Sequence, residues 1–168
     1  MTSKVLVTYA TKYGSTAEIA EKISQILSDS GLDTELIPVK KVQNVKDYVG
    51  VVLGSAVYMG NWRKEARKFL YLKEKELTTV PIWVFSSGPV GEGDPVELLD
   101  GWQFPPRLQI VADRIKPRDI TVFHGTVDPE KLTRFDKWIM KNINSPTGDY
   151  RDWEAIISWA QSIAEELK

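Results

Sequence analysis

Five short apolar segments alternate with amphipathic segments along this chain, and that alternation constrains its fold more than any other feature of the sequence. The apolar segments have the length of buried strands, and the segments between them space their apolar residues at helical intervals. Such an alternation predicts an α/β fold, a doubly wound five-stranded parallel sheet with right-handed crossovers. Strands are predicted over residues 4–9, 33–39, 48–53, 80–86 and 119–123, with helices beginning near residues 15, 61, 108, 131 and 153.

Length, charge and composition narrow the class of protein further. A chain of 168 residues suits one domain, which we expect to span residues 1–168. Its 22 basic residues nearly balance 23 acidic ones, so no overall field favours nucleic acid. Cysteine is absent and histidine occurs once, which excludes disulfides, iron–sulfur clusters and the usual zinc sites. No apolar run reaches the roughly 18 residues of a membrane span. We therefore expect a cytoplasmic protein, with peripheral contact to the inner face of the membrane left open.

The turn after the first strand carries hydroxyl groups and a glycine directly before a helix, and it has two interpretations. In the first, Ser15 caps the helix and Glu18 reaches back to form a capping box, which is the commoner arrangement for such a sequence. In the second, the hydroxyls of Thr11, Ser15 and Thr16 and the free amides of the helix start bind a phosphate. Gly14 would then permit the tight backbone turn.

Other classes of phosphate site fit less well. The chain lacks the Gly-rich Lys-Ser/Thr motif of nucleotide triphosphatases and the Gly-x-Gly-x-x-Gly motif of dinucleotide-binding domains. The acidic residues of a phosphoacceptor receiver domain are missing as well, because Ala10-Thr11 and Gly54-Ser55 follow the first and third strands.

Two further loops are predicted at the same edge of the sheet, where ligands of doubly wound folds bind. The segment 54–62 combines small residues with an aromatic, a thioether and an amide, and suits a flat heteroaromatic ring beside Tyr58. Trp62 is expected in the core instead, because its helical spacing to Ala66 and Phe69 predicts a buried face of the second helix. The segment 86–89, Ser-Ser-Gly-Pro, offers backbone groups to a polar ring edge, or is simply an exposed turn.

These three loops on a five-stranded parallel sheet of order 2-1-3-4-5 resemble the flavodoxins, which hold FMN at such loops. More narrowly, residues 54–60, residues 123–125 with the added helix 135–140, and residues 148–153 resemble the flavodoxin-like branch that includes menaquinone-dependent protoporphyrinogen IX dehydrogenase. In that branch an extra helix lies between strand five and the last helix.

The resemblance implies which residues contact the cofactor. It assigns the FMN phosphate to one turn and the isoalloxazine to two loops. The residues for the phosphate are Thr11, Lys12, Tyr13, Gly14, Ser15 and Thr16. Those for the ring are Ala56, Val57, Tyr58, Met59 and Gly60 on one side and Ser87, Gly88, Pro89 and Val90 on the other.

The resemblance also implies an FMN-dependent oxidoreductase acting on a quinone or a porphyrinogen. The alternatives are an electron carrier that docks on a redox partner protein, and a flavodoxin-like binding domain without flavin. Electron-carrier flavodoxins are usually strongly acidic and flank the flavin with an aromatic residue in the strand-four loop. This chain is nearly neutral and has Ser-Gly-Pro there, which favours an open flavin face and an enzyme.

Two other features have no assigned role. His124 ends the fifth strand, where it is either structural, the commoner case, or a proton-transfer group. The helix 131–143 is expected to pack Leu132, Phe135 and Trp138 on the domain. Alternatively, its aromatic residues among basic ones contact a membrane or a hydrophobic substrate. No catalytic acid, base or nucleophile stands out elsewhere.

Overall fold

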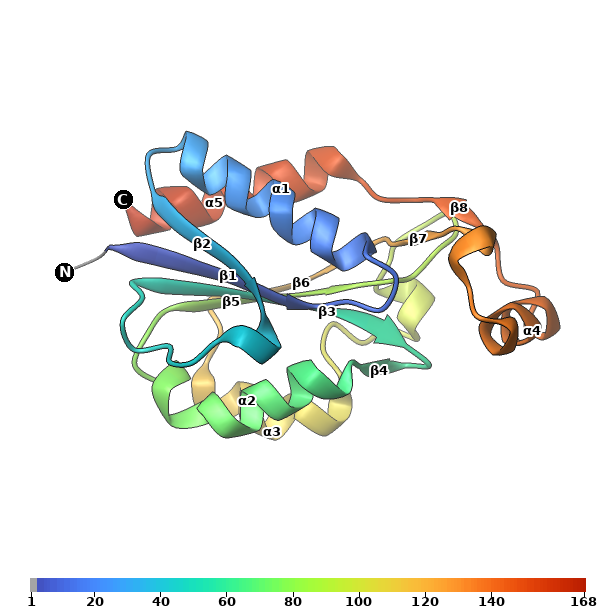
Figure 1. The fold of residues 1–168 in the computed structure, drawn as a ribbon, viewed down its shortest axis with the longest axis horizontal. Helices are drawn as coiled ribbons and strands as arrows, with labels where there is room; N and C mark the ends of the chain where they lie inside the picture. The colour runs from blue at the N-terminus through green and yellow to red at the C-terminus, as the bar shows by residue number, and fades with distance from the viewer. Residues whose placement is uncertain (1–2) are drawn as a thin grey trace.

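A parallel sheet with helices on both faces forms the body of the protein (Figure 1). The computed structural model describes residues 3–168. The strand order β2-β1-β3-β5-β6 and the parallel pairing confirm the predicted doubly wound topology. These strands are β1 (Lys4–Ala10), β2 (Asp33–Pro38), β3 (Gly50–Tyr58), β5 (Ile82–Ser87) and β6 (Asp119–Phe123).

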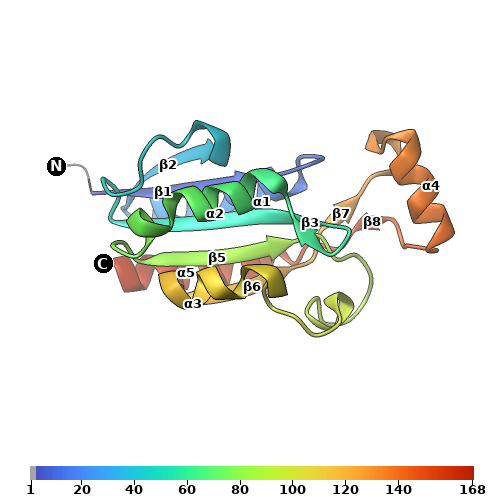
Figure 2. The same cartoon turned by 90° about the horizontal axis from the view of Figure 1, so that it is seen from below.

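Four helices cover the two faces of the sheet, α1 and α5 on one side and α2 and α3 on the other (Figures 1 and 2). Their bounds are α1 (Ser15–Asp29), α2 (Lys64–Leu77), α3 (Gln109–Ile115) and α5 (Trp153–Leu167). Short 3-10 turns lie at η1 (Val39–Lys41), η2 (Glu97–Leu99) and η3 (Pro106–Leu108). Gly31 follows α1 with φ 93°, the left-handed conformation that glycine commonly adopts after a helix.

Two hydrophobic cores, one on each face, explain why the strands are apolar throughout. Val5 and Val7 belong to the core beneath α1 and α5, whereas Leu6 between them belongs to the core beneath α2 and α3. All three side chains are fully buried. Successive residues of a strand point to opposite faces, so a sheet covered on both sides needs apolar residues at every position.

The region after the third strand differs from the prediction. Residues 54–58, expected as a loop, continue β3 as far as Tyr58, and β4 (Asn61–Trp62) pairs back on it as a hairpin. The turn has positive φ at both central residues, 51° at Met59 and 75° at Gly60, as a two-residue hairpin of type I′ requires. Trp62 therefore lies on a strand and not on the second helix, which begins only at Lys64.

An insertion between β6 and α5 leaves the sheet and returns. The strands β7 (Thr126–Val127) and β8 (Gly148–Asp149) form its antiparallel base. Between them lie the 3-10 turn η4 (Pro129–Lys131) and α4 (Arg134–Asn142), a shorter helix than the predicted 131–143. Figure 2 shows α4 beyond the end of the sheet, away from the helices that cover its faces. Within residues 3–168, no helix combines the length and apolar character needed to cross a bilayer.

Candidate functional site

A cavity of about 210 Å³ lies at the carboxyl ends of β1, β3 and β5, where the strand order reverses. This is the ligand position expected for a doubly wound sheet. All three predicted loops contribute to the cavity, and most of the residues assigned to FMN line it. The exceptions are Gly14, Gly60, Pro89 and Val90.

The turn before α1 does not form the predicted capping box. The N-cap position is Gly14, with φ 94°, and no side chain of the described residues caps the helix. Thr11 Oγ1 instead accepts the Gly14 amide at 3.0 Å. The Glu18 carboxylate contacts Arg151 Nη1 at 2.8 Å, because the return from the insertion brings that guanidinium beside the first turn of α1.

This geometry leaves the start of α1 ready for an anion. The Ser15 hydroxyl is buried and has no hydrogen-bond partner among residues 3–168. Uncapped amides and the positive end of the helix dipole face the same way, which favours a phosphate. The Thr16 hydroxyl, unlike that of Ser15, already has a hydrogen-bond partner. Its Oγ1 lies 3.1 Å from Ser87 Oγ, and this contact joins the first loop to the third. The helix start thus fits the phosphate of FMN through backbone amides and Ser15.

Two glycines allow the loops after β5 and β6 to pack closely against each other and against β3 at the floor of the cavity. A Cβ added to Gly125 would lie 2.7 Å from the Gly88 Cα, and one added to Gly88 would lie 3.0 Å from the Val57 carbonyl oxygen. The Gly125 amide donates to the Pro89 carbonyl at 2.9 Å. Glycine at both positions therefore permits backbone contact that any side chain would prevent.

A charged cluster closes the cavity on the side of the insertion. Asp136, the one buried residue of α4, contacts Lys12 Nζ at 2.8 Å and accepts a hydrogen bond from the Tyr58 hydroxyl at 2.5 Å. The Tyr13 hydroxyl donates to the same carboxylate. Burial alone would raise the pKa of Asp136, but hydrogen bonds from Lys12, Tyr13 and Tyr58 outweigh it and lower that pKa to about 2.

Lys12 is held on both sides within this cluster. Its ammonium lies 3.4 Å from the centroid of the Tyr58 ring, within the range of a cation–π contact. Partial burial opposes its charge, yet the contacts with Asp136 and Tyr58 raise the pKa of Lys12 above its ordinary value. The cation of the first loop is therefore engaged by the insertion.

Sequence reasoning missed the wall that the insertion contributes. Apolar side chains of this segment line the cavity together with Asp136. These residues are Val127, Leu132, Ile139, Met140 and Ile143. The spacing of 132, 136, 139, 140 and 143 follows one helical face, so a stripe that contained the carboxylate was present in the sequence.

The prediction that Phe135 and Trp138 pack on the domain is wrong. Both side chains are 61% exposed, and their rings stack on each other at 6.4 Å between centroids. Leu132 does face inward and is half-buried. Met59, assigned to ring contact, borders the cavity from the hairpin turn but is 67% exposed.

Trp62 and His124 lie outside the cavity. Trp62 is buried as predicted, donates from Nε1 to Ser86 Oγ at 2.7 Å, and packs edge-on against Phe104. His124 is half-buried, and its Nε2 is buried without a hydrogen-bond partner in the part of the chain that the structure describes. His124 does not line the cavity, so this geometry offers no support for a proton-transfer role.

Comparison with known proteins identifies the family. The model of a family described as "Flavodoxin domain" matches residues 6–154. This chain belongs to that flavodoxin domain family. Its cofactor is FMN, in agreement with the fit of the α1 start to a phosphate. The curated relatives include "Protoporphyrinogen IX dehydrogenase [quinone]" of Escherichia coli K12, 22% identical over 172 residues, covering 96% of this chain and 94% of the relative.

Solved structures share the flavodoxin fold. Oxidised flavodoxin 1 from Bacillus cereus superposes with a TM-score of 0.63 at 14% identity, covering 99% of this chain and all of the other. The rubredoxin:oxygen oxidoreductase of Desulfovibrio gigas also gives 0.63, at 18% identity. That comparison covers 99% of this chain and 36% of the oxidoreductase, so this chain spans about a third of that protein's length.

Proposed function

We propose that FMN lies in the cavity with its phosphate at the start of α1 and its ring between the loops after β3 and β5. The phosphate is held by backbone amides of α1, by the unpaired Ser15 hydroxyl and by Thr11. The ring lies between residues 56–60 and residues 87–90. The close packing of Gly88 against Gly125 and Val57 holds the backbone of the third loop at the edge of this space.

We propose that the protein is an oxidoreductase that transfers electrons from protoporphyrinogen IX to a quinone. The observation that carries this proposal is the second, apolar wall of the cavity, from Leu132, Ile139 and Met140 of the insertion. A wall of this kind suits a large apolar substrate beside the cofactor. The E. coli relative named protoporphyrinogen IX dehydrogenase [quinone], which this chain matches over nearly its whole length, supports the same reaction.

In this function the protein supplies position, and FMN supplies the capacity to accept and release electrons. The wall that carries Thr11, Ser15 and Gly88 orients the cofactor. The apolar wall from the insertion excludes water from the space beside the cofactor. No residue of the cavity is assigned as a proton donor, because the one buried carboxylate, Asp136, is fully engaged by Lys12, Tyr13 and Tyr58.

An anaerobic assay tests the reaction. Purified protein loaded with FMN is mixed with protoporphyrinogen and a soluble menaquinone analogue, and porphyrin fluorescence is followed. We expect turnover well above that of free FMN at the same concentration. A rate equal to the free-FMN control would favour the second candidate, an electron carrier that docks on a redox partner, which the shared fold of the solved flavodoxins supports.

Two glycines provide a matched test of the phosphate position. Gly14 and Gly31 have nearly equal φ, 94° and 93°, and open space around the position of a Cβ. Asp at either position therefore imposes the same backbone strain, about 1–2 kcal/mol. Gly14→Asp also places a carboxylate beside the phosphate, so we expect FMN binding to be lost in that variant and retained in Gly31→Asp. Equal FMN content in the two variants would refute the site.

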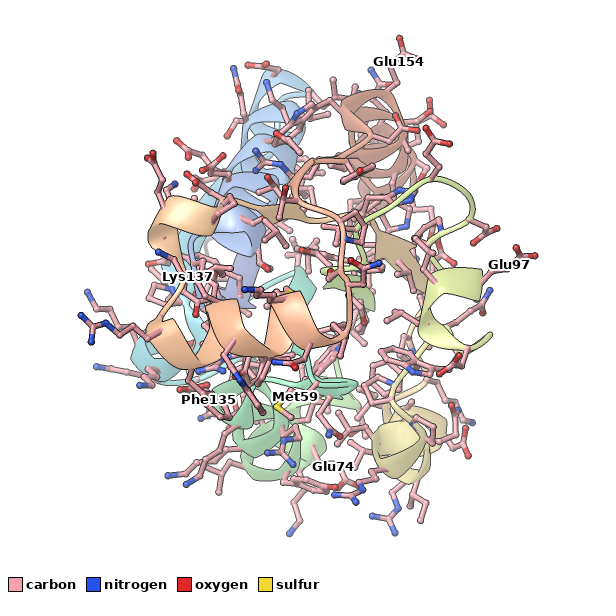
Figure 3. All side chains as sticks on the ribbon, turned by 90° about the vertical axis from the view of Figure 1, so that its right-hand side faces the viewer. Met59, Glu74, Glu97, Phe135, Lys137 and Glu154 are labelled. Atoms are coloured by element: carbon pink, nitrogen blue, oxygen red, sulfur yellow. The ribbon has the colours of Figure 1, made fainter. Side chains whose placement is uncertain are left out.

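We also propose that the outer face of α4 contacts an anionic membrane surface. Phe135 and Trp138 are exposed, and Met59 lies beside the helix in Figure 3. The basic residues of the same segment are Lys131, Arg134, Lys137 and Lys141. The one acidic residue of 131–143, Asp136, is turned inward. An exposed apolar face flanked by cations is typical of peripheral helices on anionic lipid.

Vesicle co-sedimentation tests this contact. We expect binding to vesicles containing phosphatidylglycerol, weaker binding to pure phosphatidylcholine, and loss of binding in Phe135→Ser/Trp138→Ser. The matched control is Tyr71→Ser/Leu72→Ser, which removes an equally exposed pair from α2. Equal binding by the two double variants would show that α4 does not form the contact.

A further inference from the structure

The helix α4 is held to the domain in an unusual way. It lies beyond the end of the sheet (Figure 2), and its outward aromatics Phe135 and Trp138 take no part in a core. Its one buried residue is Asp136, whose side chain is 4% exposed. A buried carboxylate is costly unless it is paired and hydrogen-bonded, so the position of α4 depends on the partners of this group.

Those partners all come from the two loops that contact the flavin in the proposed site. Lys12 and Tyr13 belong to the turn before α1, and Tyr58 ends β3. The first turn of α4 adds a second connection, because the Thr133 amide donates to the Tyr13 hydroxyl at 3.4 Å. Thr133 Oγ1 in turn accepts the Asp136 amide at 3.1 Å and caps the helix.

The donors of the site thus divide into two sets. The uncapped amides of α1 and the Ser15 hydroxyl have no partners among the described residues and are available to a phosphate. The ammonium of Lys12 and the hydroxyls of Tyr13 and Tyr58 are already engaged by Asp136. Were the phosphate to take Lys12 and Tyr13, the buried carboxylate would lose most of the contacts that compensate its burial.

We propose that Asp136 is a positioning residue that anchors α4 as the roof of the flavin cavity, and that Lys12, Tyr13 and Tyr58 serve this carboxylate and not the FMN phosphate. The roof carries Leu132, Ile139 and Met140, so the anchor also sets the apolar wall of the cavity. This inference rests on the flavin site proposed above. It reassigns two residues, Lys12 and Tyr13, that the family resemblance gives to the phosphate.

Comparison of FMN with riboflavin, which lacks the phosphate, separates the two roles. We expect Asp136→Asn and Lys12→Met each to lower the affinity for FMN and for riboflavin by a similar factor, about tenfold or more, because closure of the cavity is lost. Tyr58→Phe, which keeps the ring, should act in the same direction with a smaller effect. Ser15→Ala should weaken FMN alone, and the control Asp113→Asn, on the exposed side of α3, should change neither affinity.

Two outcomes would overturn the inference. If Lys12→Met lowers the affinity for FMN but not for riboflavin, Lys12 is a phosphate ligand. If Asp136→Asn leaves both affinities unchanged or tightens FMN, the carboxylate is not an anchor for a roof over the flavin.

Hydrogen exchange of the flavin-free protein tests the anchor independently of FMN. We expect amides of α4 to exchange at least tenfold faster in Asp136→Asn than in the parent protein, with α5 unchanged. Unchanged exchange in α4 would contradict the inference. A parent protein that binds no flavin would refute the proposed function instead, and this measurement would still decide whether Asp136 holds α4.

Discussion

The helices α4 and α5 follow each other in the chain but are attached to the domain by opposite physical means. α5 buries Ile156, Ala160 and Ile163 against the sheet and α1. α4 exposes its aromatic residues and buries one carboxylate. Apolar burial is non-directional and adds up along a helix, whereas a charged anchor acts at one point and depends on its partners. We therefore expect α5 to belong to the cooperative core and α4 to detach without unfolding it.

The largest expected effect comes from removing apolar contact in α5. Ile163 is fully buried, so Ile163→Ala should lower the free energy of unfolding by about 2–5 kcal/mol. The matched variant in the insertion is Ile143→Ala, whose side chain is 67% exposed and should change that free energy by less than about 0.5 kcal/mol. Urea denaturation of both variants measures the difference. Similar losses would show that α4 is part of the same cooperative unit.

Acid should release α4 while α5 stays folded. The pKa of Asp136 is lowered from 3.8 to about 2, so its ionised form contributes stability that is complete above pH 3.8 and lost as the pH falls through about 2. The effect on α4 docking is on the order of 2 kcal/mol. The raised pKa of Lys12 acts at the opposite end of the scale, where its contribution is lost only as the pH rises above 10.5.

Backbone amide NMR signals of Thr133 and Asp136 follow this transition as the pH is lowered from about 5 to about 1. Asp136→Asn, which has no titrating group at this position, serves as the control and should lack the transition. A midpoint above pH 4 in the parent protein would mean that the carboxylate is not stabilised by its partners.

The smallest expected difference in the free energy of unfolding comes from substituting one tryptophan in each of the two helices. Trp159 in α5 donates from Nε1 to Asp119 at 2.7 Å and packs edge-on against Phe85 and Phe123. Trp159→Phe removes that hydrogen bond and should cost about 1–2 kcal/mol. Trp138→Phe in α4 should remain within about 0.5 kcal/mol of the parent protein. Thermal unfolding of the pair measures both, and an equal cost at Trp138 would place its ring in a packed interface.

The comparison also shows where sequence reasoning succeeds. Apolar spacing identifies the inner face of α5 because that face packs against the sheet. Asp152, directly before the helix, caps it by accepting the Ala155 amide at 3.0 Å. The same reasoning wrongly predicts that Phe135 and Trp138 point inward, because it assigns large apolar residues to the core. In α4 the correct face contains a carboxylate, which spacing rules count as a surface residue.

The turn before α1 is a second instance. Its residues suit both a capping box and a phosphate site, and local sequence favours the more common cap. The backbone decides against the cap, because Gly14 in a left-handed conformation occupies the N-cap position and Glu18 pairs with Arg151, which is distant in sequence. Neither fact can be read from residues 11–18 alone.

The sequence by itself determined the alternating strands and helices, their order in a parallel sheet, and the edge of that sheet at which ligands of doubly wound folds bind. These follow from local periodicity, turn residues and the restricted topology of parallel sheets, all of which act over short stretches of chain. Only the tertiary structure decided that Lys12, Tyr13 and Tyr58 meet Asp136, and that the insertion forms a wall of the cavity. The free energy of a buried carboxylate depends on partners more than 70 residues away, and no local pattern encodes that distance.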